Sequence, residues 1–527
     1  MEDPRRSSPE NPDLGPYLLK LARDTAASGG EATKALDYAL RASRSFEKSA
    51  AAGADLASSL HLVAAIYCRM GKMDAAVAAL DKAIVVGKRA NHSPVVFSGY
   101  MQLGDTCSML GQSDRAIDCY KQGLKIQMEI FGNDDPRIAH TCRYLAEAHM
   151  QAMQFDEADK LCLKALEIHR VHTLPASPEE AGDRRLMALI REAKGDHESA
   201  LEHLVLASMI MIANGNETEI ATIDLSIGNI YSSLARYDEA VFAYQKALTI
   251  FKSSRGDAHS SVAAVFIRLA DLYHKIGKPR ESHSYCENAL RIYENPPAGE
   301  TTSAEEVASG MVELSTIYEA FGEHERALRL LRKARNLMAD RPGQRSTAAG
   351  IEARIGMMLY TIGRYGESRR SFESAVVKLR NSGEKKSAYF GVVLNQMGLA
   401  CIRLFEIKEA VEVFEEARET LERERGPCHP DTLGVYSNLA ATYDAMGRIG
   451  ESIEILKYVL KLREEKLGTA NPDFDEERKR LAELLKESGK SWNKKTKSLG
   501  NLFNPNRTRA ENRRMTMLPG AFEARNI

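Results

Sequence analysis

Apolar residues recur along most of this chain at the three- and four-residue spacing of amphipathic helices, and the pattern is clearest between residues 430 and 467. There the sequence PDTLGVYSNLAATYDAMGRIGESIEILKYVLKLREEKL contains two apolar stripes separated by Gly447. The stripe residues are Leu439, Ala440 and Tyr443 in the first segment and Ser452, Leu456, Val459 and Leu460 in the second. The pattern predicts two helices joined by a short turn. Such a pair cannot bury both stripes by itself, so it needs a similar pair on each side.

The small residue Ala440 has equivalents at intervals of 40 to 45 residues, which we call the ladder residues: Ala64, Gly104, Ala146, Ala188, Gly228, Ala270, Ser315, Gly356, Gly398 and Ala440. Seven positions later the chain favours glycine: Gly71, Gly111, Gly195, Gly277, Gly322, Gly363 and Gly447. Twelve positions later it favours alanine: Ala76, Ala116, Ala158, Ala200, Ala240, Ala327 and Ala410. These spacings are typical of tetratricopeptide helix pairs, in which small residues let the helices approach and glycine ends the first helix. The prediction is an all-α superhelical solenoid of about ten 42-residue pairs with end caps.

Several predicted first helices begin with a capping residue followed by proline, ten positions before the ladder residue. The pairs are Ser93-Pro94, Asp135-Pro136, His429-Pro430 and Asn471-Pro472. The last pair points to Ala482 and to an eleventh first helix without a second. We therefore expect a disordered N-terminus at 1–14, a degenerate helical cap at 15–54, ten repeats at 55–472, a capping helix at 473–489 and a basic disordered tail at 490–527.

Two places depart from the regular pattern. Around Ala188 an arginine, Arg191, replaces the usual aromatic residue, and the preceding linker is rich in proline. Residues 294–306, ENPPAGETTSAEE, account for the single 45-residue step. Both segments are expected to bend the stack locally or to form loops on one face.

Composition adds little to this picture, but the distribution of charge does. The formal net charge of all 527 residues is −1, whereas residues 490–527 hold nine Lys/Arg and two Asp/Glu, a net of +7. The N-terminus has no apolar segment typical of a secretory signal, and the longest apolar run, 204–213, is half the length that a bilayer span needs. Five of the eight cysteines, Cys68, Cys107, Cys162, Cys286 and Cys401, occupy apolar registers, which indicates reduced core residues of a cytosolic protein.

The sequence contains no catalytic constellation. The phosphate-binding pattern GxxxxGK[ST] is absent, as are HExxH, GxSxG and any EF-hand loop. The nearest histidine pair, His169 and His172, ends a predicted second helix beside no carboxylate cluster, so we interpret it as solvated. We expect a non-enzymatic protein without cofactor or metal.

A repeat stack of this kind offers a concave wall built by its first helices, which can hold an extended peptide. Positions near three before, one after and five after each ladder residue are expected to face it. Candidate groove residues there are Arg143, Asn229, Arg268, His274, Arg354, Asn395, Arg403 and Asn438. Asn and Arg at such positions can bind peptide carbonyls or carboxylates. The alternative is that these side chains only keep the wall soluble.

The basic tail has three interpretations. Its cations are Lys494, Lys495, Lys497, Arg507, Arg509, Arg513 and Arg514, together with Lys490 and Arg525. They can meet an acidic polymer surface, such as the acidic termini of tubulin, or anionic lipid in a peripheral membrane contact. A solubilising end without a ligand is the alternative. Nucleic acid is not expected, because no recognition fold accompanies the charge.

The linkers between repeats indicate which family of repeat proteins the chain resembles. The form G-x-x-H-P is complete at 426–430 and partial at 132–136, 256–260 and 468–472. With the 42-residue period and the segment YSNLAATYDAMGR, residues 55 to about 490 resemble the kinesin light chains, most closely the plant kinesin light chain-related or cellulose synthase–microtubule uncoupling family. The resemblance implies association with cortical microtubules in the cytoplasm, steadying of those microtubules against moving cellulose synthase complexes, and scaffolding with calmodulin-binding IQ67-domain proteins.

One departure from the animal kinesin light chains weighs against motor recruitment. Those proteins place a long heptad coiled coil before the repeats, whereas the residues that precede the first repeat here are Ala-rich and have no sustained leucine heptads. The predicted function is therefore a microtubule-associated, protein-binding scaffold. The alternative is a cargo adaptor bound to a kinesin heavy chain.

Overall fold

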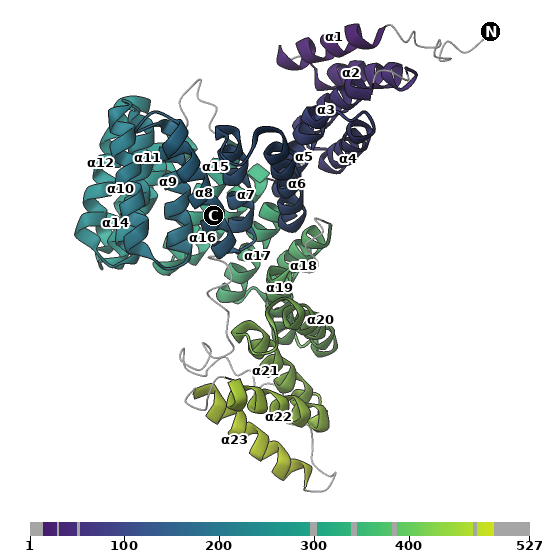
Figure 1. Cartoon of the computed structure of the whole chain (residues 1–527). Coiled ribbons are helices and arrows are strands. Elements are labelled where there is room, and N and C mark those ends of the chain that lie inside the picture. Colours follow the sequence, from purple (N-terminus) through teal and green to yellow (C-terminus); the bar gives the residue numbers. More distant parts are fainter. Residues whose placement is uncertain are drawn as a thin grey trace, which may run out of the picture. The chain divides into compact units, whose positions relative to one another are not determined.

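The computed structural model describes residues 14–28, 31–49, 53–295, 303–338, 345–381, 387–466 and 472–489. These residues form 23 α-helices and no strand (Figure 1). The chain divides into two compact units, of which unit 1 holds helices α1–α14 and unit 2 holds helices α15–α23. Residues 1–13 of the predicted disordered N-terminus (1–14) and the whole predicted tail 490–527 lie outside the described residues. The division between the units falls within 294–306, the segment with the irregular 45-residue step.

The helices of unit 1 are α1 (Gly15–Ala27), α2 (Ala32–Glu47), α3 (Gly53–Arg69), α4 (Met73–Arg89), α5 (Ser93–Met109), α6 (Ser113–Phe131), α7 (Pro136–Gln151), α8 (Phe155–His172), α9 (Pro178–Ala193), α10 (His197–Ala213), α11 (Glu217–Ser233), α12 (Tyr237–Arg255), α13 (Ser260–Lys275) and α14 (Pro279–Glu294). Those of unit 2 are α15 (Ala304–Ala320), α16 (His324–Met338), α17 (Arg345–Ile362), α18 (Tyr365–Asn381), α19 (Ala388–Arg403), α20 (Ile407–Arg425), α21 (Pro430–Ala445), α22 (Ile449–Lys466) and α23 (Pro472–Ser488).

All ten ladder residues lie in odd-numbered helices, from Ala64 in α3 to Ala440 in α21, and all ten are buried. The seven alanines predicted twelve positions later are each 0% exposed. Three repeats have serine there instead, and each hydroxyl donates to the carbonyl of its own ladder residue. These bonds are Ser282 to Ala270 at 2.6 Å, Ser368 to Gly356 at 2.7 Å and Ser452 to Ala440 at 2.8 Å. The all-α repeat fold predicted from the sequence is confirmed.

The packing partner of each ladder residue lies sixteen positions later, and its size compensates for that of the ladder residue. The four glycine positions face aromatic rings: Gly104 faces Tyr120, Gly228 faces Tyr244, Gly356 faces Phe372 and Gly398 faces Phe414. Sixteen positions after the alanine and serine ladder residues the side chains are smaller, namely Leu80, Cys162, Leu204, Cys286, Leu331 and Leu456. A Cβ on Gly398 would lie 2.5 Å from the ring of Phe414, so an aromatic there requires glycine.

The turn after each first helix has a left-handed residue seven positions after the ladder residue. The seven predicted glycines have φ between 69° and 89°. In the other three repeats Met153, Ala235 and Phe405 adopt the same conformation, with φ of 61°, 57° and 63°. The backbone hydrogen bonds that close the turn are also present in these three repeats. The Arg236 N–H donates to the Tyr231 carbonyl at 2.9 Å, just as the Gln112 N–H donates to the Cys107 carbonyl in a turn that has glycine. A non-glycine residue in this conformation is strained by about 1–2 kcal/mol.

Replacing Ala235 by glycine is expected to stabilise unit 1 by about 1 kcal/mol, because it removes the left-handed strain at an exposed residue. Ala78→Gly is the matched control, since Ala78 is exposed in the interior of α4, where glycine costs about 1 kcal/mol. Thermal unfolding followed by circular dichroism measures both. The two identical chemical changes should shift the midpoint in opposite directions; shifts of the same sign would contradict the strain argument.

Helix starts follow the predicted capping with one correction. The Asp135 carboxylate accepts the Arg137 N–H at 2.9 Å, and His429 Nδ1 accepts the Asp431 N–H at 3.2 Å. The cap of α5, however, is His92 rather than Ser93, because His92 Nδ1 accepts the Val95 N–H while Ser93 is already helical. Asn471 lies outside the described residues. Ala482 in α23 is exposed, since no second helix follows in the described chain to cover it.

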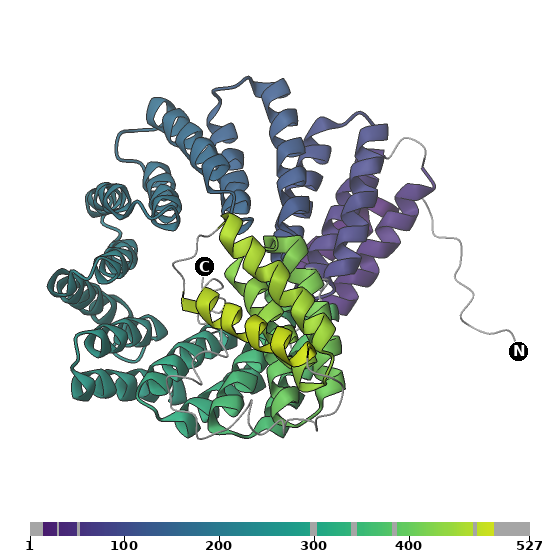
Figure 2. The same ribbon diagram turned by 90° about the horizontal axis from the view of Figure 1, so that it is seen from below.

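Consecutive first helices are in contact within each unit. In unit 1, α3 contacts α5 and α7 contacts α9; in unit 2, α19 contacts both α17 and α21. Consecutive second helices lie farther apart. The first helices therefore line the inner side of each curve, and the second helices are spread on the outer side. Figure 2 shows the helix pairs of unit 1, from purple to teal, following a curved row.

Candidate binding surfaces

The eight predicted groove residues all lie in first helices, in α7, α11, α13, α17, α19 and α21. None of them is fully exposed: Asn395 and Asn438 are 1% and 7% exposed, and the other six are half-buried. Arg268 and His274 also have polar or electrostatic contacts. A role of these residues in peptide binding stays a prediction.

Several of these side chains link one first helix to the next in unit 2. Asn438 Nδ2 in α21 donates to Asn395 Oδ1 in α19 at 2.9 Å. Arg403 Nε in α19 donates to the Tyr360 hydroxyl in α17 at 3.2 Å, and its guanidinium lies over the rings of Tyr360 and Tyr365. The Arg354 guanidinium in α17 donates to the Thr316 hydroxyl in α15. These contacts hold the inner wall at a fixed spacing.

The wall nevertheless retains an unused donor. Asn395 is 1% exposed, and its Nδ2 has no hydrogen-bond partner among the described residues. The neighbouring Gln396 is 2% exposed, and its Nε2 likewise has no hydrogen-bond partner among the described residues. A buried amide donor without an acceptor is costly and rare, and neither nitrogen has surface accessible to an external ligand in this structure.

In unit 1 the groove residues have mainly internal partners. Asn229 Oδ1 accepts the Tyr244 hydroxyl at 2.9 Å. Arg143 lies 4.0 Å from a carboxylate oxygen of Asp183, whose side chain is fully buried. The other oxygen of Asp183 lies 2.5 Å from Nδ1 of His169, which is also buried. The interpretation of His169 as solvated is therefore wrong; the histidine turns inward from the last turn of α8 to meet α9.

The His169–Asp183 pair belongs to a register that recurs along the chain. A residue near the end of a second helix meets one fourteen positions later in the next first helix. The polar pairs at this register are Gln127–Thr141 at 2.6 Å, His169–Asp183, Glu422–Tyr436 and Arg463–Glu477 at 2.9 Å. In other repeats it is apolar, as at Leu379 and Val393, which lie in the same core cluster. These polar pairs join neighbouring repeats, and their members are buried except for Glu422, which is half-buried.

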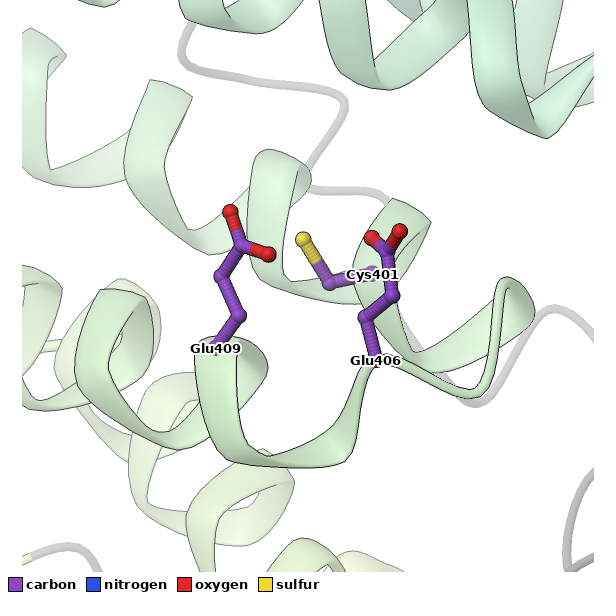
Figure 3. A group of neighbouring side chains, drawn as sticks. All are labelled: Cys401, Glu406 and Glu409. Atoms are coloured by element: carbon purple, nitrogen blue, oxygen red, sulfur yellow. The ribbon is translucent and has the colours of Figure 1, made fainter.

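One cluster in unit 2 has the residue types of a metal site. The thiol of Cys401 and carboxylate oxygens of Glu406 and Glu409 lie within 4.8 Å of one another, with the thiol pointing between the two carboxylates (Figure 3). Arg369 already binds both carboxylates, at 2.9 Å to Glu406 and 2.7 Å to Glu409. Burial raises the pKa of the Cys401 thiol to about 12, so it is protonated at neutral pH. In the described structure the two carboxylates of the cluster are held in a salt-bridge network by Arg369.

The cysteines have the character predicted from the sequence. All eight are free thiols, and Cys107, Cys162, Cys286 and Cys401 are buried while Cys68 is half-buried. Burial raises the pKa of Cys142 to about 11 and also raises that of Cys162, so these thiols are weak nucleophiles. No helix in the described part of the chain is both long and apolar enough to cross a bilayer.

A groove lies on the outer side of unit 2, between the second helices α18 and α20, with α19 beneath. Its volume is about 290 Å³. The floor consists of the buried side chains Val376, Leu394, Met397 and Val413. Four glutamates form the rim, Glu373 on α18 and Glu409, Glu412 and Glu416 on α20. We call this the acidic groove. It was not predicted, although the three- and four-residue spacing of the α20 glutamates around Val413 is visible in the sequence.

Comparisons with known proteins agree with the repeat architecture. The family profile "Tetratricopeptide repeat" matches residues 55–129, 219–295 and 389–465. The chain is 64% identical to "Protein KINESIN LIGHT CHAIN-RELATED 1" of Arabidopsis thaliana over 96% of its own length and 85% of that protein. It is 53% identical to the protein named KINESIN LIGHT CHAIN-RELATED 2 of Arabidopsis thaliana, over 94% of its own length and 76% of that protein. It is 52% identical to KINESIN LIGHT CHAIN-RELATED 3 of the same organism, over 95% of its own length and 78% of that protein.

Proposed function

The chain belongs to the kinesin light chain-related family of tetratricopeptide repeat proteins, and on that premise we propose that it is a non-enzymatic scaffold on cortical microtubules. In this role it stabilises the microtubules and links them to cellulose synthase complexes in the cytoplasm. Proteins with IQ67 domains are further proposed partners of the repeat surface. The proposal assigns the binding of partner proteins to the inner wall of the repeats and the contact with microtubules to the basic segment 490–527.

The observation that carries the scaffold role is the half-buried Arg403 on the inner wall of unit 2, whose guanidinium lies over the rings of Tyr360 and Tyr365. A guanidinium held in this way is suited to a carboxylate of an extended peptide from a partner protein. Beside it, the buried contact between Asn395 and Asn438 holds α19 and α21 at a fixed spacing.

The basic segment 490–527 supports the choice of microtubules. Its net charge is +7, and the rest of the chain carries −8, so cations are concentrated at one end. Such a segment is attracted to an acidic polymer surface, and the attraction weakens when salt shortens the Debye length from about 10 Å at 0.1 M.

Co-sedimentation with polymerised tubulin tests this function. The full chain is expected to pellet at low salt and to be released as salt rises, because the contact is electrostatic. Removal of residues 490–527 should weaken pelleting, as should tubulin whose acidic termini have been removed by limited proteolysis. Circular dichroism of the shortened chain checks that its helices are retained. If the intact, folded chain stays in the supernatant at low salt, direct microtubule binding is wrong.

The second candidate is a cargo adaptor for a kinesin heavy chain, which the names of the relatives favour. Recovery of a stoichiometric complex with a motor heavy chain from cells would support it. Under the scaffold proposal, the tagged chain recovers tubulin without a stoichiometric motor subunit.

A further inference from the structure

The acidic groove of unit 2 has an excess of negative charge that its own cations do not balance. Arg380, the one cation among the lining residues, binds Glu416 at 2.7 Å. Arg369 is shared among three carboxylates, those of Glu373, Glu406 and Glu409. Glu412 in the middle of the rim is exposed and has no ion pair with a described residue. Five carboxylates thus face two guanidinium groups, a net of −3, so the groove favours a cationic ligand that also carries apolar groups.

We propose that the acidic groove binds a distal segment of the same chain, residues 507–518, with sequence RTRAENRRMTML. The segment contains one glutamate and four arginines, namely Arg507, Arg509, Arg513 and Arg514. Its net charge of +3 is opposite in sign to that of the groove and similar in size. Guanidinium groups form paired hydrogen bonds with carboxylates, and their aliphatic stems can cover the apolar surface inside the rim.

The apolar residues of the segment suit the floor of the groove. Met515, Met517 and Leu518 directly follow the last arginine pair. The floor consists of four buried side chains, and Val377, which also lines the groove, is 54% exposed. Methionine adapts to surfaces of irregular shape, and covering the floor removes apolar surface from water. Cationic and apolar groups are therefore adjacent in the segment, as carboxylates and apolar groups are in the groove.

The segment lies far enough along the chain to reach the groove. α23 ends at Ser488 in the same unit, three interhelical steps of about 10 Å from α20. With a displacement of up to one helix length, about 25 Å, along the helix axes, the span is roughly 40 Å. The residues 489–506 extend to about 60 Å and bridge it. Lys490, Lys494 and Lys495 reach only about 25 Å from Ser488, so they do not contact the groove.

The tether makes a weak interaction sufficient. A segment on a linker of this length has an effective concentration at the groove on the order of 1 mM. An intrinsic dissociation constant of about 0.1 mM then leaves about nine in ten grooves occupied. Docking withholds the four arginines from other partners, whereas the lysines nearer to α23 stay available to an acidic polymer. The groove thus divides the basic end of the chain into a docked part and an available part.

The test measures how tightly full-length chains bind a dye-labelled peptide of residues 505–520, by fluorescence anisotropy at low salt. In Arg507→Gln/Arg509→Gln/Arg513→Gln/Arg514→Gln, called the arginine variant, the chain's own segment no longer competes. The arginine variant should therefore bind the peptide about tenfold more tightly than the wild type does. Salt at about 0.5 M should weaken this binding, since contacts between arginine and the rim are screened. A peptide with Met515→Ser/Met517→Ser/Leu518→Ser should bind more weakly, because it cannot cover the floor.

Glu412→Lys, added to the arginine variant, reverses the charge in the middle of the rim and should weaken peptide binding about fivefold. The matched control is Glu454→Lys in the same background, because Glu454 is the equivalent exposed residue 42 positions later on α22, outside the groove. Both positions are exposed, so circular dichroism should show intact helices. The control should leave peptide binding unchanged.

Three results would overturn the proposal. Equal peptide binding by the wild type and the arginine variant, or none by either, would show that the segment does not occupy the groove. Equal effects of Glu412→Lys and Glu454→Lys would place the contact elsewhere. Self-association of the wild type in analytical ultracentrifugation that the arginine variant lacks would assign the groove to a second copy of the chain. No tubulin is present, so failure here is distinct from failure of microtubule binding.

Discussion

Replacing Asp183 by alanine is expected to lower the free energy of unfolding by about 3–5 kcal/mol, the usual cost of removing one partner from a buried pair. Asp183 is fully buried, lies 2.5 Å from His169 Nδ1, and is the acidic neighbour of Arg143 at 4.0 Å. Without it, a buried imidazole N–H loses its acceptor and a half-buried guanidinium loses its nearby carboxylate. Because the pair joins α8 to α9, the effect should be concentrated at that junction.

Urea unfolding followed by circular dichroism measures the loss, and hydrogen exchange of α7, α8 and α9 locates it. Asp156→Ala is the control, since Asp156 binds Lys194 at 2.8 Å but its side chain is 82% exposed and should contribute little. The double variant His169→Leu/Asp183→Leu should recover part of the stability, because apolar residues occupy this register in other repeats. Equal stability of Asp183→Ala and Asp156→Ala would contradict a structural role for the buried pair.

The second large effect is expected at the ladder residue Gly398. Gly398→Ala should destabilise unit 2 by about 1–3 kcal/mol, the range for overpacked cores. The added Cβ would lie 2.5 Å from the ring of Phe414, which is 0% exposed and cannot move freely. Adding Phe414→Leu should restore much of the loss, because the resulting alanine–leucine pair is the one found at Ala64 and Leu80.

The control for Gly398→Ala is Gly366→Ala in α18, where a Cβ meets open space and alanine favours the helix. A double-mutant cycle on residues 398 and 414 by urea unfolding gives the coupling between them. Size compensation predicts that Gly398→Ala costs less in the Phe414→Leu background than in the wild type. An equal cost in both backgrounds would show that the two positions do not compensate.

Much of the fold could be predicted because each contact that defines it is repeated ten times. A single alanine such as Ala64 carries little information, but equivalents at a period near 42 identify a helix crossing. The rule that glycine ends the first helix was incomplete, since Met153, Ala235 and Phe405 adopt the same left-handed turn. There the backbone bonds of the turn and the packing of the repeat determine the conformation despite the residue's own preference.

The candidate surfaces were predicted less well, because they depend on distances between repeats. Periodicity placed Asn395 and Asn438 in first helices, but it did not show that they bond to each other. His169 and Asp183 were missed as a pair since they lie in different helices beside the least regular repeat. The acidic groove exists because α18 and α20 spread apart over α19, a feature of packing that no single helix encodes.

The central claim, that this repeat protein is a microtubule-binding scaffold whose basic segment contacts the polymer, is tested most directly by binding isotherms on polymerised tubulin at low salt. Two full-length chains are compared: the wild type and Lys494→Gln/Lys495→Gln/Lys497→Gln. The account predicts weaker binding for the lysine variant than for the wild type, with the difference lost at high salt. Equal binding of both folded chains, or no binding of either, would contradict it.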